Sequence, residues 1–178
     1  MGINLMSAGR PDAIALDYMR KSPPTDLMGL ARDLGVRINY AALDGFAGKI
    51  EMVQSQNGPE FIITINDADS FSRQRFTLAH ELAHFIKHRK QIEAGNIVDN
   101  AMYRSLLPEP MEWEANRYAA QLLMPLTAMT KLWREGLRDP AIIATRLGVS
   151  EQAAKIRLQQ IQGTLNAAIA FDRPQAAG

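Results

Sequence analysis

Residues 76–85 read FTLAHELAHF, and this stretch decides the fold and the chemistry that we expect of the chain. It places His80, Glu81 and His84 in the pattern His-Glu-x-x-His, within a segment whose other residues are mostly apolar. On a helix, residues four apart lie about 40° apart around the axis and about 6 Å along it. The two histidines can therefore bind one metal ion from one face, while Glu81 lies beside that face. The pattern predicts two imidazole ligands and a carboxylate that acts on a metal-bound water.

The alternative is a chance pattern in which both histidines pair or pack in the core. The chain has only three histidines, and apolar residues surround the motif, so this helix should be buried. Buried polar groups without partners are costly, and a metal ion removes that cost. We therefore favour a metal site, and zinc is the ion that suits imidazole and carboxylate ligands with one open position. One zinc ion per chain is expected.

A third protein ligand is expected from residues 111–120, MEWEANRYAA, the next strong helix. Glu112 and Asn116 are four apart and share a face, so Glu112 can complete the site while Asn116 supports a ligand histidine by a hydrogen bond. Glu114 points about 200° away from Glu112 and is the alternative ligand. His88 follows His84 by one turn, about 6 Å further along a straight helix, so we expect a supporting or surface role for it.

These residues predict the hydrolysis of a peptide bond. Zinc would polarise the carbonyl, and Glu81 would activate the water and later protonate the leaving amine. A second donor to the oxyanion is also expected. Tyr103, Tyr118 or an arginine could supply it.

The rest of the chain predicts an α+β fold. Short helices are expected over 11–21 and 25–34, and strands over 37–43, 46–54 and 60–66, forming a small antiparallel sheet of about three strands. Further helices are expected over 70–90, 110–124 and 126–136, and as two helices within 139–161, with 91–109 irregular. We divide the chain into a metallopeptidase domain at 1–136, a C-terminal helical pair at 137–172, packed on the same domain, and a tail at 173–178.

The C-terminal pair resembles a helix-turn-helix, with residues 142–154 as first helix and turn and 151–160 as second helix. Arg157, however, stands where a recognition helix usually has an apolar residue, and the net charge of the chain is only +1. We therefore expect these helices to pack structurally or to dock a protein rather than to contact DNA.

Composition excludes several classes of function. The 178 residues include no cysteine, so disulfide frameworks, thiolate zinc sites and cysteine nucleophiles are ruled out. The apolar fraction of 47% and charged fraction of 22% are those of an ordinary globular protein. No secretory signal or membrane-spanning run is visible, which predicts a cytoplasmic protein.

Two segments together resemble the ImmA/IrrE family of metallopeptidases. These are residues 75–84, RFTLAHELAH, and residues 112–125, EWEANRYAAQLLMP, and the likeness covers roughly residues 24–160. Ala83 departs from the family, which commonly has glycine there.

The resemblance implies a gluzincin-like site with His80, His84 and a glutamate as ligands and Glu81 as general base, and it favours Glu112 over Glu114. It also implies a protein substrate, a helix-turn-helix transcriptional repressor of phage, mobile-element, stress-response or toxin–antitoxin genes. The alternative is a metal-stabilised module or toxin–antitoxin partner that binds a protein without cutting it.

Overall fold

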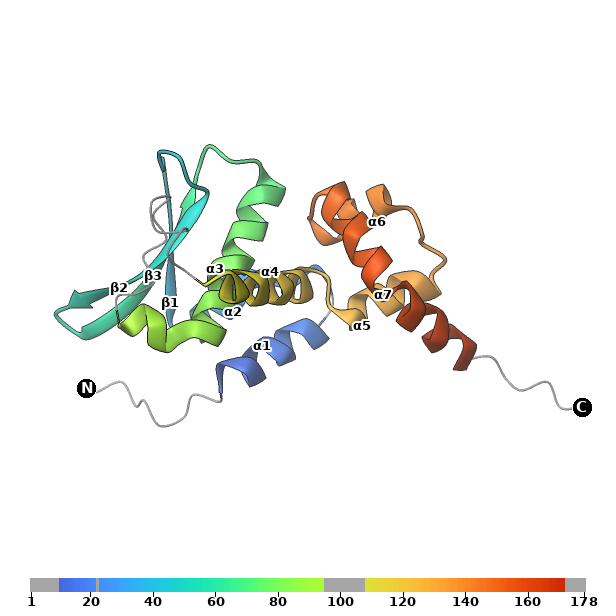
Figure 1. Ribbon diagram of the computed structural model, residues 1–178, viewed down its shortest axis with the longest axis horizontal. Helices are drawn as coiled ribbons and strands as arrows, with labels where there is room; N and C mark the ends of the chain where they lie inside the picture. The colour runs from blue at the N-terminus through green and yellow to red at the C-terminus, as the bar shows by residue number, and fades with distance from the viewer. Residues whose placement is uncertain (1–9, 22, 95–107, 172–178) are drawn as a thin grey trace, which may run out of the picture.

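The computed structural model describes residues 10–21, 23–94 and 108–171. These residues form the predicted α+β fold, a three-stranded sheet with helices against it (Figure 1). The first elements are α1 (Pro11–Arg20), α2 (Leu27–Asp33), β1 (Val36–Ala41), β2 (Gly48–Ser55) and β3 (Gly58–Asn66). The remaining elements are α3 (Phe71–Glu93), α4 (Glu109–Leu123), α5 (Leu126–Arg134), α6 (Pro140–Leu147) and α7 (Glu151–Phe171). Tyr103 and the predicted tail at 173–178 lie outside the described residues.

The sheet is mixed, in the order β1-β3-β2, and the prediction of an antiparallel sheet was wrong for one of its two pairings. β2 and β3 form the expected antiparallel hairpin, with Ser55 opposite Gly58. β1 pairs with β3 in parallel, with Val36 opposite Phe61. The chain leaves β1, passes to the far edge of the sheet and returns through the hairpin, so β3 separates β1 from β2. Alternation of apolar residues identifies a strand but not its neighbour, so the sequence pattern could not reveal this order.

The connection from β1 to β2 is held by the last residue of β3. The side-chain amide of Asn66 donates to the carbonyl oxygens of Leu43 at 2.9 Å and Phe46 at 3.2 Å. These bonds bring the start of β2 close to α3. A β-carbon at Gly48 would lie only 2.4 Å from a methyl carbon of Thr77, so the close approach of β2 to α3 requires glycine there.

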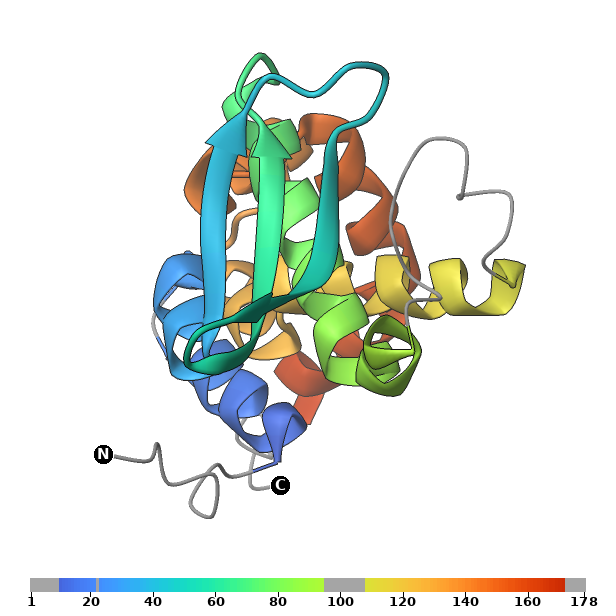
Figure 2. The ribbon, with the colours of Figure 1, turned by 90° about the vertical axis from the view of Figure 1, so that its left-hand side faces the viewer.

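Helix α3 crosses one face of the sheet (Figure 2). Ile50, Ile63 and Ile65 of the sheet are fully buried. The ring of Phe61 meets that of Phe85 edge-on at 4.9 Å. With the sheet on one side and α4 on the other, every residue of α3 from 77 to 86 is buried. A helix that is buried on both sides is usually apolar. Buried polar residues in such a helix therefore indicate a function.

Helices α5, α6 and α7 lie at the end of the molecule away from the sheet (Figure 1). Buried residues of α6 and α7, including Ile143, Leu147 and Leu165, belong to the same hydrophobic cluster as the sheet. Gly148 ends α6 with a φ of +64°, a left-handed conformation that favours glycine. The proposed domain boundary at residue 136 stays a prediction. Within the described residues, no helix is both long enough and apolar enough to cross a membrane.

Candidate metal centre

His80 and His84 come from consecutive turns of α3, and both are buried. Their Nε2 atoms face each other at 3.0 Å. The spacing of four residues thus brings the two imidazoles together on the side of α3 that faces α4.

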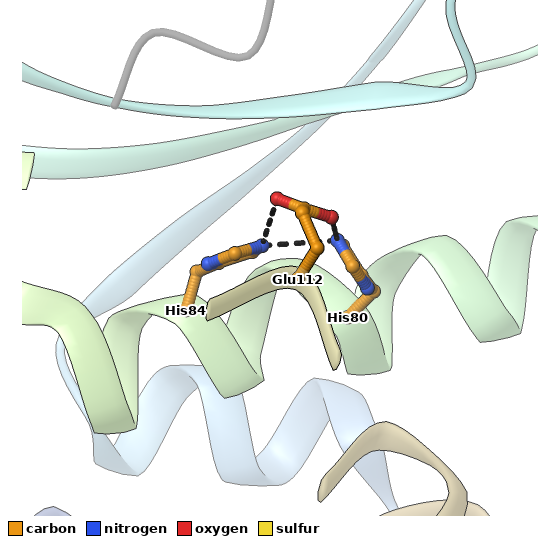
Figure 3. A group of neighbouring side chains, drawn as sticks. All are labelled: His80, His84 and Glu112. Carbon is orange, nitrogen blue, oxygen red and sulfur yellow. Dashed lines mark hydrogen bonds and ion pairs between the residues drawn. The ribbon is translucent and has the colours of Figure 1, made fainter. Parts of the chain in front are cut away.

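Glu112 reaches the same point from the first turn of α4. Its carboxylate oxygens lie 3.3 Å from Nε2 of His80 and 3.3 Å from Nε2 of His84 (Figure 3). Helix α4 can place it there because its buried face carries the small residues Ala115 and Ala119, both 0% exposed, against α3. The three residues predicted as ligands therefore lie together.

This donor set fits a zinc ion. The ligand atoms of His80, His84 and Glu112 all lie within 4.8 Å of one another. Ligand atoms about 2.0–2.1 Å from a tetrahedral zinc ion lie roughly 3.3 Å from each other. The separations of 3.0 to 3.3 Å match that value closely enough for one ion to be bound with little movement.

The ionisation of these groups also suits a metal. Burial lowers the pKa of His84, which keeps its imidazole neutral with a lone pair available. Hydrogen bonds with His80 and His84 hold the pKa of Glu112 well below its usual range, so its carboxylate is ionised. Neutral imidazole and ionised carboxylate are the forms that bind zinc.

Asn116 contacts one of the candidate ligands at hydrogen-bond distance. Its Oδ1 lies 3.1 Å from Nδ1 of His80. Because an amide oxygen can only accept, a His80 ring that binds a metal through Nε2 would carry its proton on Nδ1 and donate it to Asn116.

Glu114, the alternative ligand, lies elsewhere. Its Oε2 is 3.2 Å from Nε2 of His88, and it does not belong to the group of three ligand atoms. His88 is 4% exposed, and its Nδ1 lies 3.1 Å from Nδ1 of His84. Of the two predicted roles for His88, support of a ligand is the one that its position allows. Its backbone leaves helical values, with φ −124° and ψ 23°, which an expectation based on a straight helix could not include.

Glu81 is fully buried and lines a cleft of about 360 Å³ together with His80 and Glu112. Arg73 and Ala47 also line this cleft. The cleft therefore brings the carboxylate of Glu81, a guanidinium group and two of the three candidate ligands within reach of one bound molecule.

Of the candidates for an oxyanion donor, Tyr118 is engaged away from the cleft. Its hydroxyl donates to Asp12 at 3.3 Å, and the ammonium group of Lys87 lies 4.5 Å from its ring centre. Arg73 is an arginine that borders the cleft, where its Nε also contacts Asp69 at 3.1 Å. The composition of the sequence did not single out this arginine, because its place depends on how the start of α3 meets β2.

A larger groove of about 1200 Å³ adjoins the cleft between α4 and α7. Phe76 and Asn116 line both spaces. Exposed apolar side chains, among them Trp113 at 71% and Ile156 at 44%, line the groove as well. The site thus opens towards an apolar surface large enough for a polypeptide.

Comparison with known proteins agrees with this architecture. The family model Peptidase M78, described as the IrrE N-terminal-like domain, matches residues 31–159. No curated protein matches the sequence. The solved structure of a Mycobacterium tuberculosis transcriptional regulator is similar in fold, with a TM-score of 0.56 and 16% sequence identity. The match covers 94% of this chain but 49% of the other, so the chain spans about half the length of that protein.

Proposed function

The chain belongs to the IrrE N-terminal-like family of M78 peptidases, and from this premise we propose that it is a zinc-dependent endopeptidase that cuts a specific protein. His80, His84 and Glu112 hold the zinc ion in this proposal, and Glu81 is the catalytic base. One observation carries it: three ligand atoms from two helices meet beside a buried glutamate in an open cleft.

When bound, zinc supplies a Lewis acid for the scissile carbonyl and lowers the pKa of the attacking water. Glu81 takes a proton from that water as its oxygen adds to the carbonyl carbon. As the carbon–nitrogen bond breaks, Glu81 delivers the proton to the leaving amine. Arg73, an arginine at the edge of the cleft, is our candidate for the further stabilisation of the oxyanion.

The surroundings of the site support a polypeptide substrate. The apolar groove shares Phe76 and Asn116 with the cleft, and its exposed Trp113 and Ile156 can bury apolar side chains of a partner. Strand β2 is an outer strand of the sheet and begins directly after Ala47, which lines the cleft. Its outer edge offers backbone groups to an extended peptide, as in other cases of strand addition.

The resemblance to ImmA/IrrE proteins leads us to propose a helix-turn-helix repressor as the substrate. The mycobacterial protein of similar fold is a transcriptional regulator. That description belongs to the mycobacterial protein, and it is compatible with a role in gene control for this chain. A module that binds its partner without cutting it is the second candidate. The groove supports the binding module as well as the endopeptidase, because either protein would need a surface that binds its partner.

Incubation with helix-turn-helix repressors from the same genome, beginning with any that a neighbouring gene encodes, tests the proposal. Zinc-loaded protein should cut its substrate at one position, identified by mass spectrometry. Glu81→Gln keeps the size of the side chain but removes the base, so cleavage should fall by roughly 10²–10⁴-fold while bound zinc is unchanged. Glu135→Gln, at an exposed glutamate that ends α5 and lines neither the cleft nor the groove, is the matched control and should cut like the wild type.

Two outcomes would count against the enzyme. Stable binding of the repressor by wild type without any cut would favour the binding module. Wild-type cleavage by Glu81→Gln would show that the assigned base is wrong.

A further inference from the structure

A line of hydrogen-bonding groups runs behind His84, away from the cleft. Glu114 Oε2 lies 3.2 Å from Nε2 of His88, and Nδ1 of His88 lies 3.1 Å from Nδ1 of His84. The other ring nitrogen of His84, Nε2, faces Glu112 at 3.3 Å. Three side chains therefore connect the surface of α4 with the candidate metal position.

The metal position at one end of this line and the carboxylate of Glu114 at the other determine which ring nitrogens carry protons. Two ring nitrogens at 3.1 Å need one proton between them, because two lone pairs or two protons would repel. When His84 binds a metal through Nε2, its proton must be on Nδ1, so His84 donates to Nδ1 of His88. His88 then carries its own proton on Nε2 and donates it to the carboxylate of Glu114, which can only accept.

The two imidazoles are supported differently. His80 is held by the neutral amide of Asn116, whereas His84 is held by an imidazole that a carboxylate polarises. The bond from His88 to the ionised carboxylate of Glu114 is stronger than one to a neutral acceptor, and it makes Nδ1 of His88 a better acceptor for the proton of His84. The line behind His84 should therefore fix the orientation of that ring more firmly and make its Nε2 a better donor to a metal.

Local structure indicates that His88 has a specific role. An imidazole that is 4% exposed needs partners for both nitrogens, and His84 and Glu114 supply them. The backbone of His88 leaves helical values at φ −124° and ψ 23°, so α3 is kinked at the residue whose ring meets both partners.

We propose that His88 and Glu114 are positioning residues that orient His84 and set its tautomer for metal binding. The inference rests on the proposed function in one respect, since it takes His84 as a ligand. It assigns Glu114, which sequence spacing left open as an alternative ligand, to the support of a ligand instead.

Zinc affinity measured by competition with a chromogenic chelator tests the proposal. His88→Ala should weaken zinc binding by about 10–100-fold, the usual loss when such a supporting group is removed. Glu114→Ala should weaken it less, because His88 remains. Glu114→Gln should restore part of the affinity, since an amide oxygen still accepts from Nε2 of His88 but lacks the charge of the carboxylate. Lys90→Ala and Glu109→Gln, exposed positions on the same two helices, are controls that should bind like the wild type.

Nitrogen NMR of the zinc-loaded wild type provides a readout that does not depend on any variant folding. We expect His88 to carry its proton on Nε2, and a scalar coupling between the Nδ1 nuclei of His84 and His88 through their shared hydrogen bond. A proton on Nδ1 of His88, or undiminished zinc affinity in His88→Ala, would overturn the proposal while leaving the three-ligand site intact. Absence of zinc binding by the wild type would overturn the site itself, and the positioning role with it.

Discussion

Two helix pairs of this molecule resemble known functional motifs, and they bury very different groups. Helix α3, packed on α4, buries His80, Glu81, His84 and His88. Within the described part of α6 and α7, the pair that resembles a helix-turn-helix, Arg157 is the buried charged residue. The first pair concentrates polar groups around one point, whereas the second buries mainly apolar side chains.

This difference is why we propose a catalytic role for the first pair and not for the second. Burial of four polar side chains on adjacent turns is costly unless something binds them, so such a cluster indicates a function. Arg157 instead donates from Nε to the carbonyl oxygen of Met124 at 3.3 Å, at the end of α4. Burial lowers the pKa of its guanidinium group. Only 9% of this residue is exposed, which agrees with the expectation of packing rather than DNA contact.

Removal of zinc should have the largest effect on cleavage and on stability, because the proposed ligands join α3 to α4. A chelator should abolish cleavage and lower the melting temperature, and added zinc should restore both. At free zinc about 1,000 times the dissociation constant, the folded state gains about 4 kcal/mol. Calorimetry with and without chelator measures this gain. An unchanged melting temperature would mean that the cluster around His80 and His84 is stable without a metal.

A substitution in the second pair should change stability but not zinc binding. Arg157→Ala removes a buried side chain and its bond to Met124, and should lower the free energy of unfolding by about 1–3 kcal/mol. Denaturation in urea measures the loss. Arg146→Ala, at an exposed position of α6, is the matched control and should change it by less than about 0.5 kcal/mol. A tenfold loss of zinc affinity in Arg157→Ala would show that the two pairs are coupled.

The smallest effect is expected for DNA. Lys155 is exposed on α7, where a recognition helix would touch phosphates. Fluorescence anisotropy of a labelled duplex at several salt concentrations should show weak binding with the same salt dependence in wild type and Lys155→Ala. A decrease of the salt slope by about 1 in the variant would indicate a phosphate contact and revive the DNA-binding hypothesis.

Local features of this fold could be predicted, because they depend on neighbouring residues. The spacing of His80 and His84 brings them together on any regular helix, and Gly148 ends α6 as its left-handed conformation requires. The hairpin of β2 and β3 followed from its turn residues in the same way.

Features that depend on distant segments could not be predicted in this way. The parallel pairing of β1 with β3 follows from the path of the chain across the sheet. The choice between Glu112 and Glu114 depends on where α4 crosses α3, and both spacings are compatible with a helix. His88 is buried at the point where α3 departs from regular geometry, and an argument from helical periodicity assumes that no such departure exists.

Zinc content of purified wild type, Glu112→Ala and Glu114→Ala, measured at saturating zinc, tests the central claim most directly. The two glutamates lie on the same helix but contact different histidines. Glu112→Ala removes a contact to His80, whereas Glu114→Ala removes a contact to His88. We predict one zinc ion per wild-type chain, loss of that ion in Glu112→Ala, and retention in Glu114→Ala. Zinc retained in Glu112→Ala but lost in Glu114→Ala, or no zinc in the wild type, would contradict the site described above.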